Sequence, residues 1–187
     1  MKKNMESGRS MIEMLGVLAI VGVLTVGGFS LVSKATTENK INQAIDEVSS
    51  LAQKTRSIFR EYVVIQKPTE KVDITDYIFK AKAFPDVLAY NNSSKVFENN
   101  EEVKMKIIHD VASGVDLHYF ILELSDLNED VCMGLVNAQW GTAASNGFIG
   151  MSFSETGTYT RTIDLGVATS SCDETSSQKP KLYLKFK

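Results

Sequence analysis

Glu13 is the most unusual titratable residue of this 187-residue chain, because it lies inside the most apolar part of the sequence. The segment around it, residues 11–32, reads MIEMLGVLAIVGVLTVGGFSLV and has no other charged residue. A carboxylate in the hydrocarbon of a bilayer costs about 2.5–3.5 kcal/mol at the centre and less near the interface. Two explanations are therefore open. Glu13 is either solvated near the lipid headgroups or held in place for a partner cation.

The segment that carries Glu13 has the length of a membrane-spanning helix. At about 1.5 Å per residue it extends roughly 33 Å, which matches a hydrocarbon core of about 30 Å. A helix on the surface of a soluble core would show a polar face, and this segment has none. Lys2, Lys3 and Arg9 precede it, so we expect the N-terminus in the cytoplasm and the rest of the chain across the membrane. A cleavable signal sequence is the alternative, but the apolar run is long and no small-x-small cleavage site follows it.

The residues in front of the apolar segment resemble the N-terminus of type IV pilins and pseudopilins. The sequence Gly8-Arg9-Ser10-Met11-Ile12-Glu13 follows the short basic leader MKKNMESG. The resemblance covers roughly the first 35 residues, and it implies that a prepilin peptidase cleaves between Gly8 and Arg9. Glu13 then becomes the fifth residue of the mature chain. Arg9 stands where the family usually has phenylalanine, methionine or leucine, and its freed α-amine is the candidate site of N-methylation.

The same resemblance implies a role for Glu13 in assembly. In the family, this glutamate pairs with the N-terminal amine of a neighbouring subunit, which offsets the burial of both charges and sets the register between apolar helices. The leading interpretation is a type IV pilus structural subunit, a prepilin held in bacterial inner-membrane lipid and then polymerised with other copies into an extracellular surface filament. The implied partners are the prepilin peptidase and an assembly ATPase with its membrane platform. A pseudopilin of type II secretion and a single-span membrane-anchored binding protein are the alternatives. Cell adhesion, aggregation, motility, DNA uptake and conjugation are all compatible with the sequence.

A single long helix is expected to position these residues. The chain has no proline before Pro68, and apolar residues recur at intervals of three and four from Ile41 to Val63. Glu38, Asp46, Glu47, Lys54 and Arg60 are predicted to lie mainly off that apolar face. The predicted organisation is a leader at 1–8, a hydrophobic transmembrane or filament-core half of the helix at 9–33, an amphipathic half at 34–66, and a globular head at 67–187.

The head is predicted to be an α+β domain with an antiparallel sheet packed against the amphipathic half of the long helix. We expect a short helix at 74–84, a polar loop at 91–100, a buried strand at 117–124 and a helix at 130–140 capped by Ser125 or Asn128. Strands are predicted at 148–153 and 159–165, with a turn at Gly157, and at 182–186. The pattern leaves open whether residues 101–111 form a helix or a strand.

Cys132 and Cys172 both lie on the side of the membrane that we expect to be outside the cytoplasm. A disulfide between them would stabilise the head by roughly 4 kcal/mol in the chain-entropy model. Two buried free thiols are the alternative, and they suit a cytosolic protein better. A disulfide between these cysteines would bound the C-terminal region of the head, and this arrangement resembles that of the type IVb pilins.

The remaining residues give no indication of an enzyme, a cofactor or a metal. No nucleophile, base and oxyanion donor are brought together by the sequence, and His109, His118 and the two cysteines lack the close spacing of zinc ligands. A net charge of −3 without a basic cluster predicts no specific nucleic-acid partner. His118 and Trp140 are expected to be structural.

Overall fold

The structure is a computed structural model that describes residues 7–61, 71–99, 103–111, 118–173 and 179–187. Side chains at 7–10, 26–31, 60, 61, 111 and 118 lie outside this description. The chain divides into two compact units, Met1–Asn39 and Lys40–Lys187, and each is described by itself. The predicted leader at 1–8 lies almost entirely outside the described residues.

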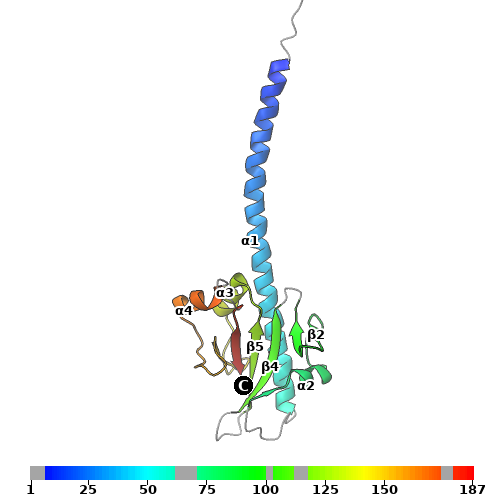
Figure 1. The fold of residues 1–187 in the computed structure, drawn as a ribbon, viewed down its shortest axis with the longest axis vertical. Coiled ribbons are helices and arrows are strands. Elements are labelled where there is room, and N and C mark those ends of the chain that lie inside the picture. Colours follow the sequence, from blue (N-terminus) through cyan, green and yellow to red (C-terminus); the bar gives the residue numbers. More distant parts are fainter. Residues whose placement is uncertain (1–6, 62–70, 100–102, 112–117, 174–178) are drawn as a thin grey trace, which may run out of the picture. The chain divides into compact units, whose positions relative to one another are not determined.

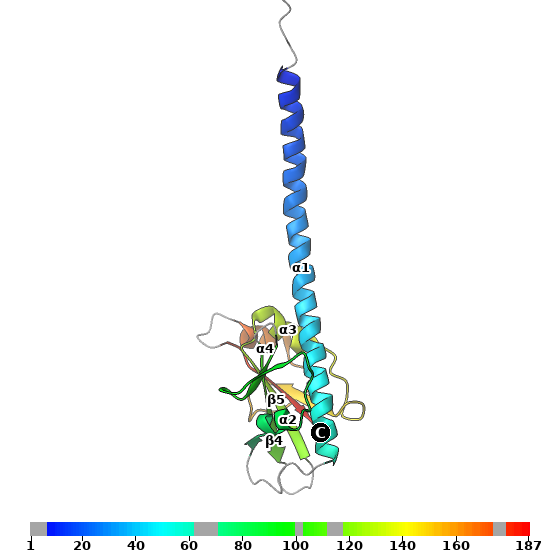
Figure 2. The same ribbon diagram turned by 90° about the vertical axis from the view of Figure 1, so that its right-hand side faces the viewer.

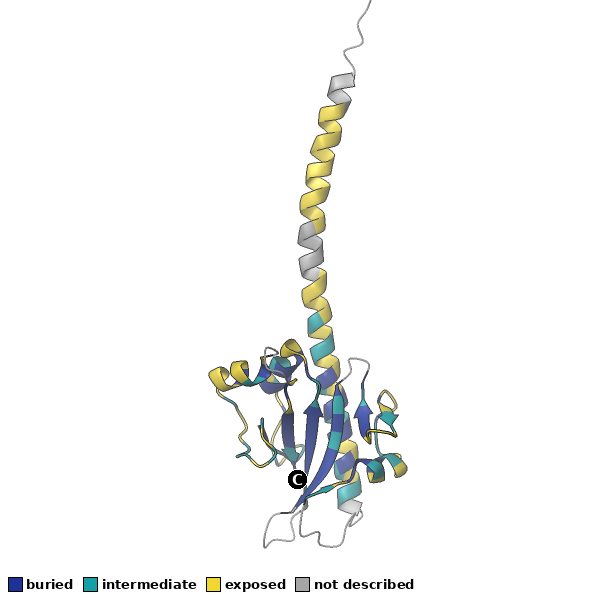
Figure 3. Cartoon of the chain, viewed as in Figure 1, coloured by how far each residue is buried: buried dark blue, intermediate teal, exposed yellow. Residues whose placement is uncertain are grey.

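The first unit is the N-terminal part of one long helix, α1, which runs from Ser7 to Glu61. The prediction of a long initial helix is thereby confirmed over the described residues. The hydroxyls of Thr25 and Thr36 donate to the carbonyl oxygens four residues earlier, Val21 and Val32, so these two β-branched polar residues are satisfied within the helix. The large apolar side chains between Met11 and Leu24 are 52–74% exposed. Figure 3 colours this part of α1 as exposed.

The part of α1 in the second unit is amphipathic. Its buried positions follow the i, i+4, i+7, i+8, i+11 spacing of one helix face, and they are Ala44, Val48, Leu51, Ala52 and Thr55. Phe59 continues this face, with its ring centroid 5.3 Å from that of His109 and 5.4 Å from that of Phe120. The predicted amphipathic pattern is correct here, with the exception of Glu47, which is only 4% exposed.

Within the described residues, the head contains one antiparallel sheet of seven strands, with the order β2-β3-β4-β5-β7-β6 and with β1 pairing on β4. Figure 1 labels β2, β4 and β5 of this sheet. Strand β7, the last strand along the chain, pairs with both β5 and β6 and therefore lies between them in the sheet. The strands are β1 (Val72–Asp73), β2 (Ala89–Asn91), β3 (Val96–Glu98), β4 (Lys104–Val111), β5 (His118–Ser125), β6 (Phe148–Ser152) and β7 (Leu182–Phe186).

The two faces of this sheet have different coverings. Period-two alternation turns Ile107, Leu122 and Leu184 to the face that packs with α1, which we call the inner face, and these three residues are in register and fully buried. The opposite, outer face carries a smaller apolar cluster of Ile108, Ile121 and Tyr183, with Tyr159 packed against it. The centre of β5 is therefore buried on both faces, as its apolar sequence predicts.

Three short helices complete the head, and Figure 2 shows them around the sheet. They are α2 (Thr75–Lys80), α3 (Glu129–Asn137) and α4 (Leu165–Cys172). The side chain of Asn128 caps α3 by accepting a hydrogen bond from Val131 N at 2.9 Å, and that of Asp164 caps α4 by accepting from Gly166 N at 2.9 Å. Asn128 is thus the N-cap of α3, one of the two predicted caps.

Three predicted elements of the head are wrong. Residues 159–165 form no strand, because only Thr160 pairs with Met151 and α4 then begins at Leu165. The predicted polar loop at 91–100 contains a hairpin, in which β2 and β3 are joined through Lys95 at a positive φ of 53°. Helix α2 is shorter than expected, since it ends at Lys80.

Candidate functional site

Glu13 lies on α1 among apolar side chains that point away from the helix in every direction. Its immediate neighbours Ile12 and Met14 are 74% and 69% exposed. A helix that is apolar all round is unfavourable in water. It is stable when lipid or other helices cover its apolar surface. The surface around Glu13 therefore requires a covering, and within the described part of its own unit these side chains are exposed.

The predicted processing residues lie at the beginning of the same helix. Gly8 and Arg9 are within the described backbone of α1, which begins at Ser7, but their side chains lie outside the described residues. Cleavage between them and modification of Arg9 thus stay predictions. Within the part of the chain that is described, no helix combines the length and the hydropathy needed to cross a bilayer.

The disulfide between Cys132 and Cys172 joins α3 to α4, and both residues are fully buried. Their Cα atoms are 5.6 Å apart, which is the usual separation for a bridged pair. Cys172 is the last residue of α4, so the bridge holds the C-terminal end of this helix against α3. The predicted disulfide is therefore present, and it bounds the C-terminal region of the head.

Helix α3 also packs closely against α1. A β-carbon added to Gly134 would lie 2.4 Å from Cγ2 of Ile41, which leaves space at this contact only for glycine. Trp140, which follows α3, is 4% exposed, and its Nε1 donates to Leu135 O at 2.8 Å. The expected structural role of Trp140 is confirmed.

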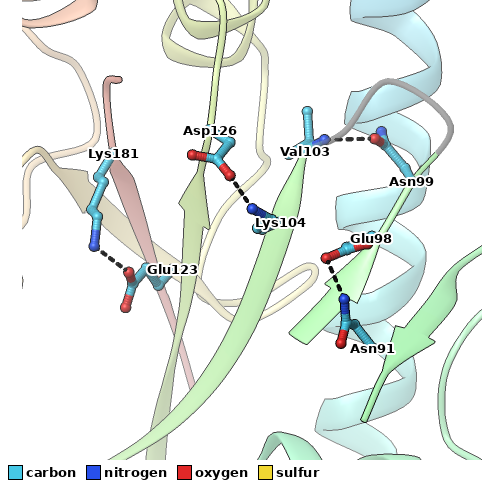
Figure 4. A network of polar contacts seen from close by, with 8 residues as sticks. All are labelled: Asn91, Glu98, Asn99, Val103, Lys104, Glu123, Asp126 and Lys181. Atoms are coloured by element: carbon cyan, nitrogen blue, oxygen red, sulfur yellow. Dashed lines mark hydrogen bonds and ion pairs between the residues drawn. The ribbon is translucent and has the colours of Figure 1, made fainter. Parts of the chain in front are cut away.

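The sheet is supported by polar contacts that the sequence pattern does not indicate, and Figure 4 shows that between Asn99 and Val103 among them. The Asn99 amide donates to the buried Glu47 carboxylate at 2.7 Å, and the Asn99 Oδ1 atom accepts from Val103 N at 2.9 Å. Gln43 supplies a second donor to Glu47 at 2.8 Å. The Glu47 carboxylate can be buried because it accepts hydrogen bonds from the side-chain amides of Asn99 and Gln43.

The outer face of the sheet carries a row of lysine–carboxylate pairs. The Nζ atom of Lys185 lies 2.6 Å from Oδ2 of Asp110. The same Nζ atom lies 4.8 Å from the ring centroid of Tyr119 and 5.4 Å from that of Tyr159. Burial, reinforced by the negative charges of Asp110 and Glu155, raises the pKa of the Tyr159 hydroxyl well above its ordinary value. These groups attach the 153–163 segment to the sheet.

Of the two histidines, only His109 has a described side chain. His109 is buried in β4 against the ring of Phe59. His118 is the first residue of β5, and its side chain lies outside the described residues. Over the described ranges, no group of three histidine, cysteine or acidic residues is arranged to hold a metal ion.

Comparison with known proteins gives the class of this fold. The family model for Bundlin matches residues 33–187, which is most of the chain. The crystal structure of type IV b pilin from Salmonella typhi superposes with a TM-score of 0.54 at 14% identity, covering 76% of this chain and 97% of that one. A search of curated proteins finds no match.

A long N-terminal helix, an antiparallel sheet packed on its second half and a disulfide-bonded C-terminal region together define a type IV pilin. The chain belongs to the Bundlin family. Its function is that of a structural subunit of the type IV pilus, the surface filament into which such subunits polymerise.

Proposed function

We propose that the chain is made as a prepilin, is cleaved between Gly8 and Arg9, and enters the filament through the apolar half of α1. The observation that carries this proposal is the uncovered apolar surface of residues 11–25, interrupted only by Glu13. Before assembly, lipid of the inner membrane covers this surface, with the head outside the cytoplasm. In the filament, the same surface is covered by the helices of neighbouring subunits.

Glu13 has the central role in this proposal. The α-amine that cleavage frees on Arg9 of one subunit pairs with the Glu13 carboxylate of the next. An ion pair inside an apolar bundle is sensitive to the loss of one partner, because the remaining charge is then buried alone. The pair therefore selects the one axial register in which both charges are satisfied. A prepilin peptidase and an assembly ATPase with its membrane platform are the partners that this pathway requires.

The mass of the N-terminal peptide from sheared filaments tests the processing step. We expect Arg9 as the first residue, with or without a methyl group on its amine. Filaments built from chains that still begin at Met1 would contradict the proposal. Confinement of the chain to the cell envelope, with none in the sheared fraction, would indicate the short piston of a secretion system.

The substitution Glu13→Val tests the assembly step. We expect the variant to accumulate in the membrane at the wild-type level and to form no filaments, because the freed amine of the neighbour has lost its partner. Glu38→Val is the matched control, since Glu38 is an exposed carboxylate of the same helix outside the apolar run. Wild-type filament yield from Glu13→Val would show that the carboxylate has no role in assembly.

A further inference from the structure

One edge of the head presents a rigid turn with an apolar tip. Leu88 N donates to Pro85 O at 3.1 Å and closes a turn whose two central residues are Asp86 and Val87. Pro85 and Leu88 are buried, whereas Val87 is 62% exposed. Lys54 of α1 donates to Phe84 O at 2.8 Å and fixes the chain just before the turn. Val87 is thus held outward by anchored residues, and the Asp86 carboxylate beside it is exposed, with no partner among the described residues.

The other edge of the head carries a preformed cavity of about 450 Å³. It lies between the end of α3 and the 161–163 segment, and its lining is mixed, with apolar groups of Val136, Trp140 and Phe148 beside the polar side chains of Gln139 and Arg161. The cavity is rigid, because Trp140 is held by Leu135 O and the neighbouring Thr160 is paired with Met151 of β6 in both directions. The Arg161 guanidinium is exposed and has no partner among the residues that the structure describes.

These two features lie at opposite ends of the sheet. The turn leads directly into β2, and the cavity is lined by Phe148, the first residue of β6. These are the first and last strands in the sheet order. They therefore cannot meet within one copy of the chain. A contact between a projection on one edge and a cavity on the other edge is heterologous. Each copy then inserts its turn into one neighbour and receives the turn of another neighbour in its cavity. Repetition of such a contact builds an open helical array if the rotation does not close.

We infer that the turn of one subunit docks into this cavity on the next subunit, with Val87 against the apolar groups of its lining and Asp86 pairing with Arg161. The occupant is a second copy of the chain because the projection and its unpaired carboxylate match the cavity and its unpaired guanidinium in both polarity and charge. Asp164, the acidic residue nearest to Arg161 in sequence, accepts a hydrogen bond from Gly166 N as the cap of α4. This inference rests on the proposed assembly, since the helices must bring the heads side by side.

A cysteine pair tests the contact in assembled filaments. We expect the double variant Val87→Cys with Gln139→Cys to give a ladder of disulfide-linked dimers, trimers and longer chains after mild oxidation, because every copy carries both halves of the contact. Val87→Cys alone should give no dimer, since a heterologous contact never brings the same position together. The pair Val87→Cys with Lys95→Cys is the matched control, because both of these residues lie at the β2 edge, and it should give none. The native disulfide is fully buried and does not take part.

Charge reversal gives a second readout. Asp86→Arg and Arg161→Asp should each lower the yield of sheared filaments about tenfold by placing like charges together, and the double variant should recover to within about threefold of wild type. Filaments that form from the cysteine pair without a ladder, dimers from Val87→Cys alone, or a double reversal as poor as the singles would overturn the contact. Failure of the wild-type chain to form filaments would instead contradict the proposed assembly itself.

Discussion

Gly134 of α3 lies so close to Ile41 of α1 that a β-carbon on the glycine would sit 2.4 Å from Cγ2 and 2.9 Å from Cγ1 of the isoleucine. The contact joins the first buried turns of α1 in the head to the helix that carries Cys132. The disulfide, α3 and α1 therefore form one continuous packed path from the C-terminal region of the head to its central helix.

Gly134→Ala should reduce the free energy of unfolding by about 1 kcal/mol. The crowding costs about 1–3 kcal/mol, and the better helix propensity of alanine returns about 1 kcal/mol. Ile41→Ala should relieve the crowding, so the double variant should be more stable than the sum of the single losses predicts. Denaturant unfolding of the purified protein measures this coupling. Gly16→Ala is the control, because nothing lies within 4 Å of its added carbon, and a loss of similar size there would contradict the argument.

Replacement of both Cys132 and Cys172 by alanine should lower the free energy of unfolding by about 2–4 kcal/mol, because the unfolded chain is no longer closed across a sequence separation of 40. Denaturant unfolding of the wild-type protein in the presence of a reductant should show the same loss of unfolding free energy. A reductant that leaves the unfolding midpoint unchanged would show that the bridge adds nothing to stability.

Much of the head was predictable because it depends on local patterns. The apolar run of β5, the alternation of β7 and the Asn128 cap of α3 each have a signal within a few residues. α4 has no such signal, since LGVATSSC contains glycine, serine and threonine and reads as a loop. Its helix is formed by the Asp164 cap, by burial of Ala168 and by the bridge at Cys172, two of which are tertiary.

The candidate site divides in the same way. Gly8, Arg9 and Glu13 are singled out by their spacing in the sequence alone, and their roles stay predictions. The burial of Glu47 is not evident in the sequence, because it depends on an amide from Asn99, 52 positions later in the chain. A charged residue on a helix is predicted to face solvent unless its distant partner is known. The turn at Asp86 and the cavity beside Arg161 are likewise products of tertiary structure.

Asn99→Ala should lower the free energy of unfolding by about 2 kcal/mol, because it removes a donor from the buried Glu47 carboxylate and an acceptor from Val103 N. Asn91→Ala is the matched control, since Asn91 donates at 3.2 Å to Glu98 (Figure 4) and accepts from Ser93 N and Ser94 N in the more exposed hairpin between β2 and β3. Its loss should be below about 1 kcal/mol. Equal losses, measured by denaturant unfolding, would show that burial of the carboxylate is not the cause.

Lys185→Met should destabilise the head by about 2 kcal/mol, because it leaves the Asp110 carboxylate only 13% exposed and without its cation. Lys80→Met should cost much less than Lys185→Met, since the side chains of Lys80 and its partner Asp76 are 70% and 33% exposed. The double variant Lys185→Met with Asp110→Asn should recover part of the loss. Thermal unfolding of the three variants decides the order, and a larger effect at Lys80 would contradict it.

The head should lose stability above pH 10 through Tyr159, which lies half-buried over the outer face of the sheet and donates to Glu155 O at 3.0 Å. Burial and the neighbouring carboxylates raise its pKa in the folded state, whereas the unfolded chain releases the same proton near the ordinary value of about 10. The unfolded state therefore binds fewer protons than the folded state above that pH. Stability is complete below it and falls, by up to about 1.4 kcal/mol per pH unit, as the pH rises toward the folded value.

Tyr159→Phe separates this effect from the titration of lysines in the same range. The variant should lose the hydrogen bond to Glu155 O at neutral pH, and its unfolding free energy should then decline less steeply than that of wild type between pH 10 and the folded pKa, because it has no proton to release. Tyrosinate absorbance of the folded protein gives an independent measure. The number of tyrosines that remain protonated at high pH should be one lower in the variant than in the wild type. Parallel stability curves for the two proteins would show that Tyr159 releases its proton equally readily in both states, and that the 153–163 segment does not shield it from solvent.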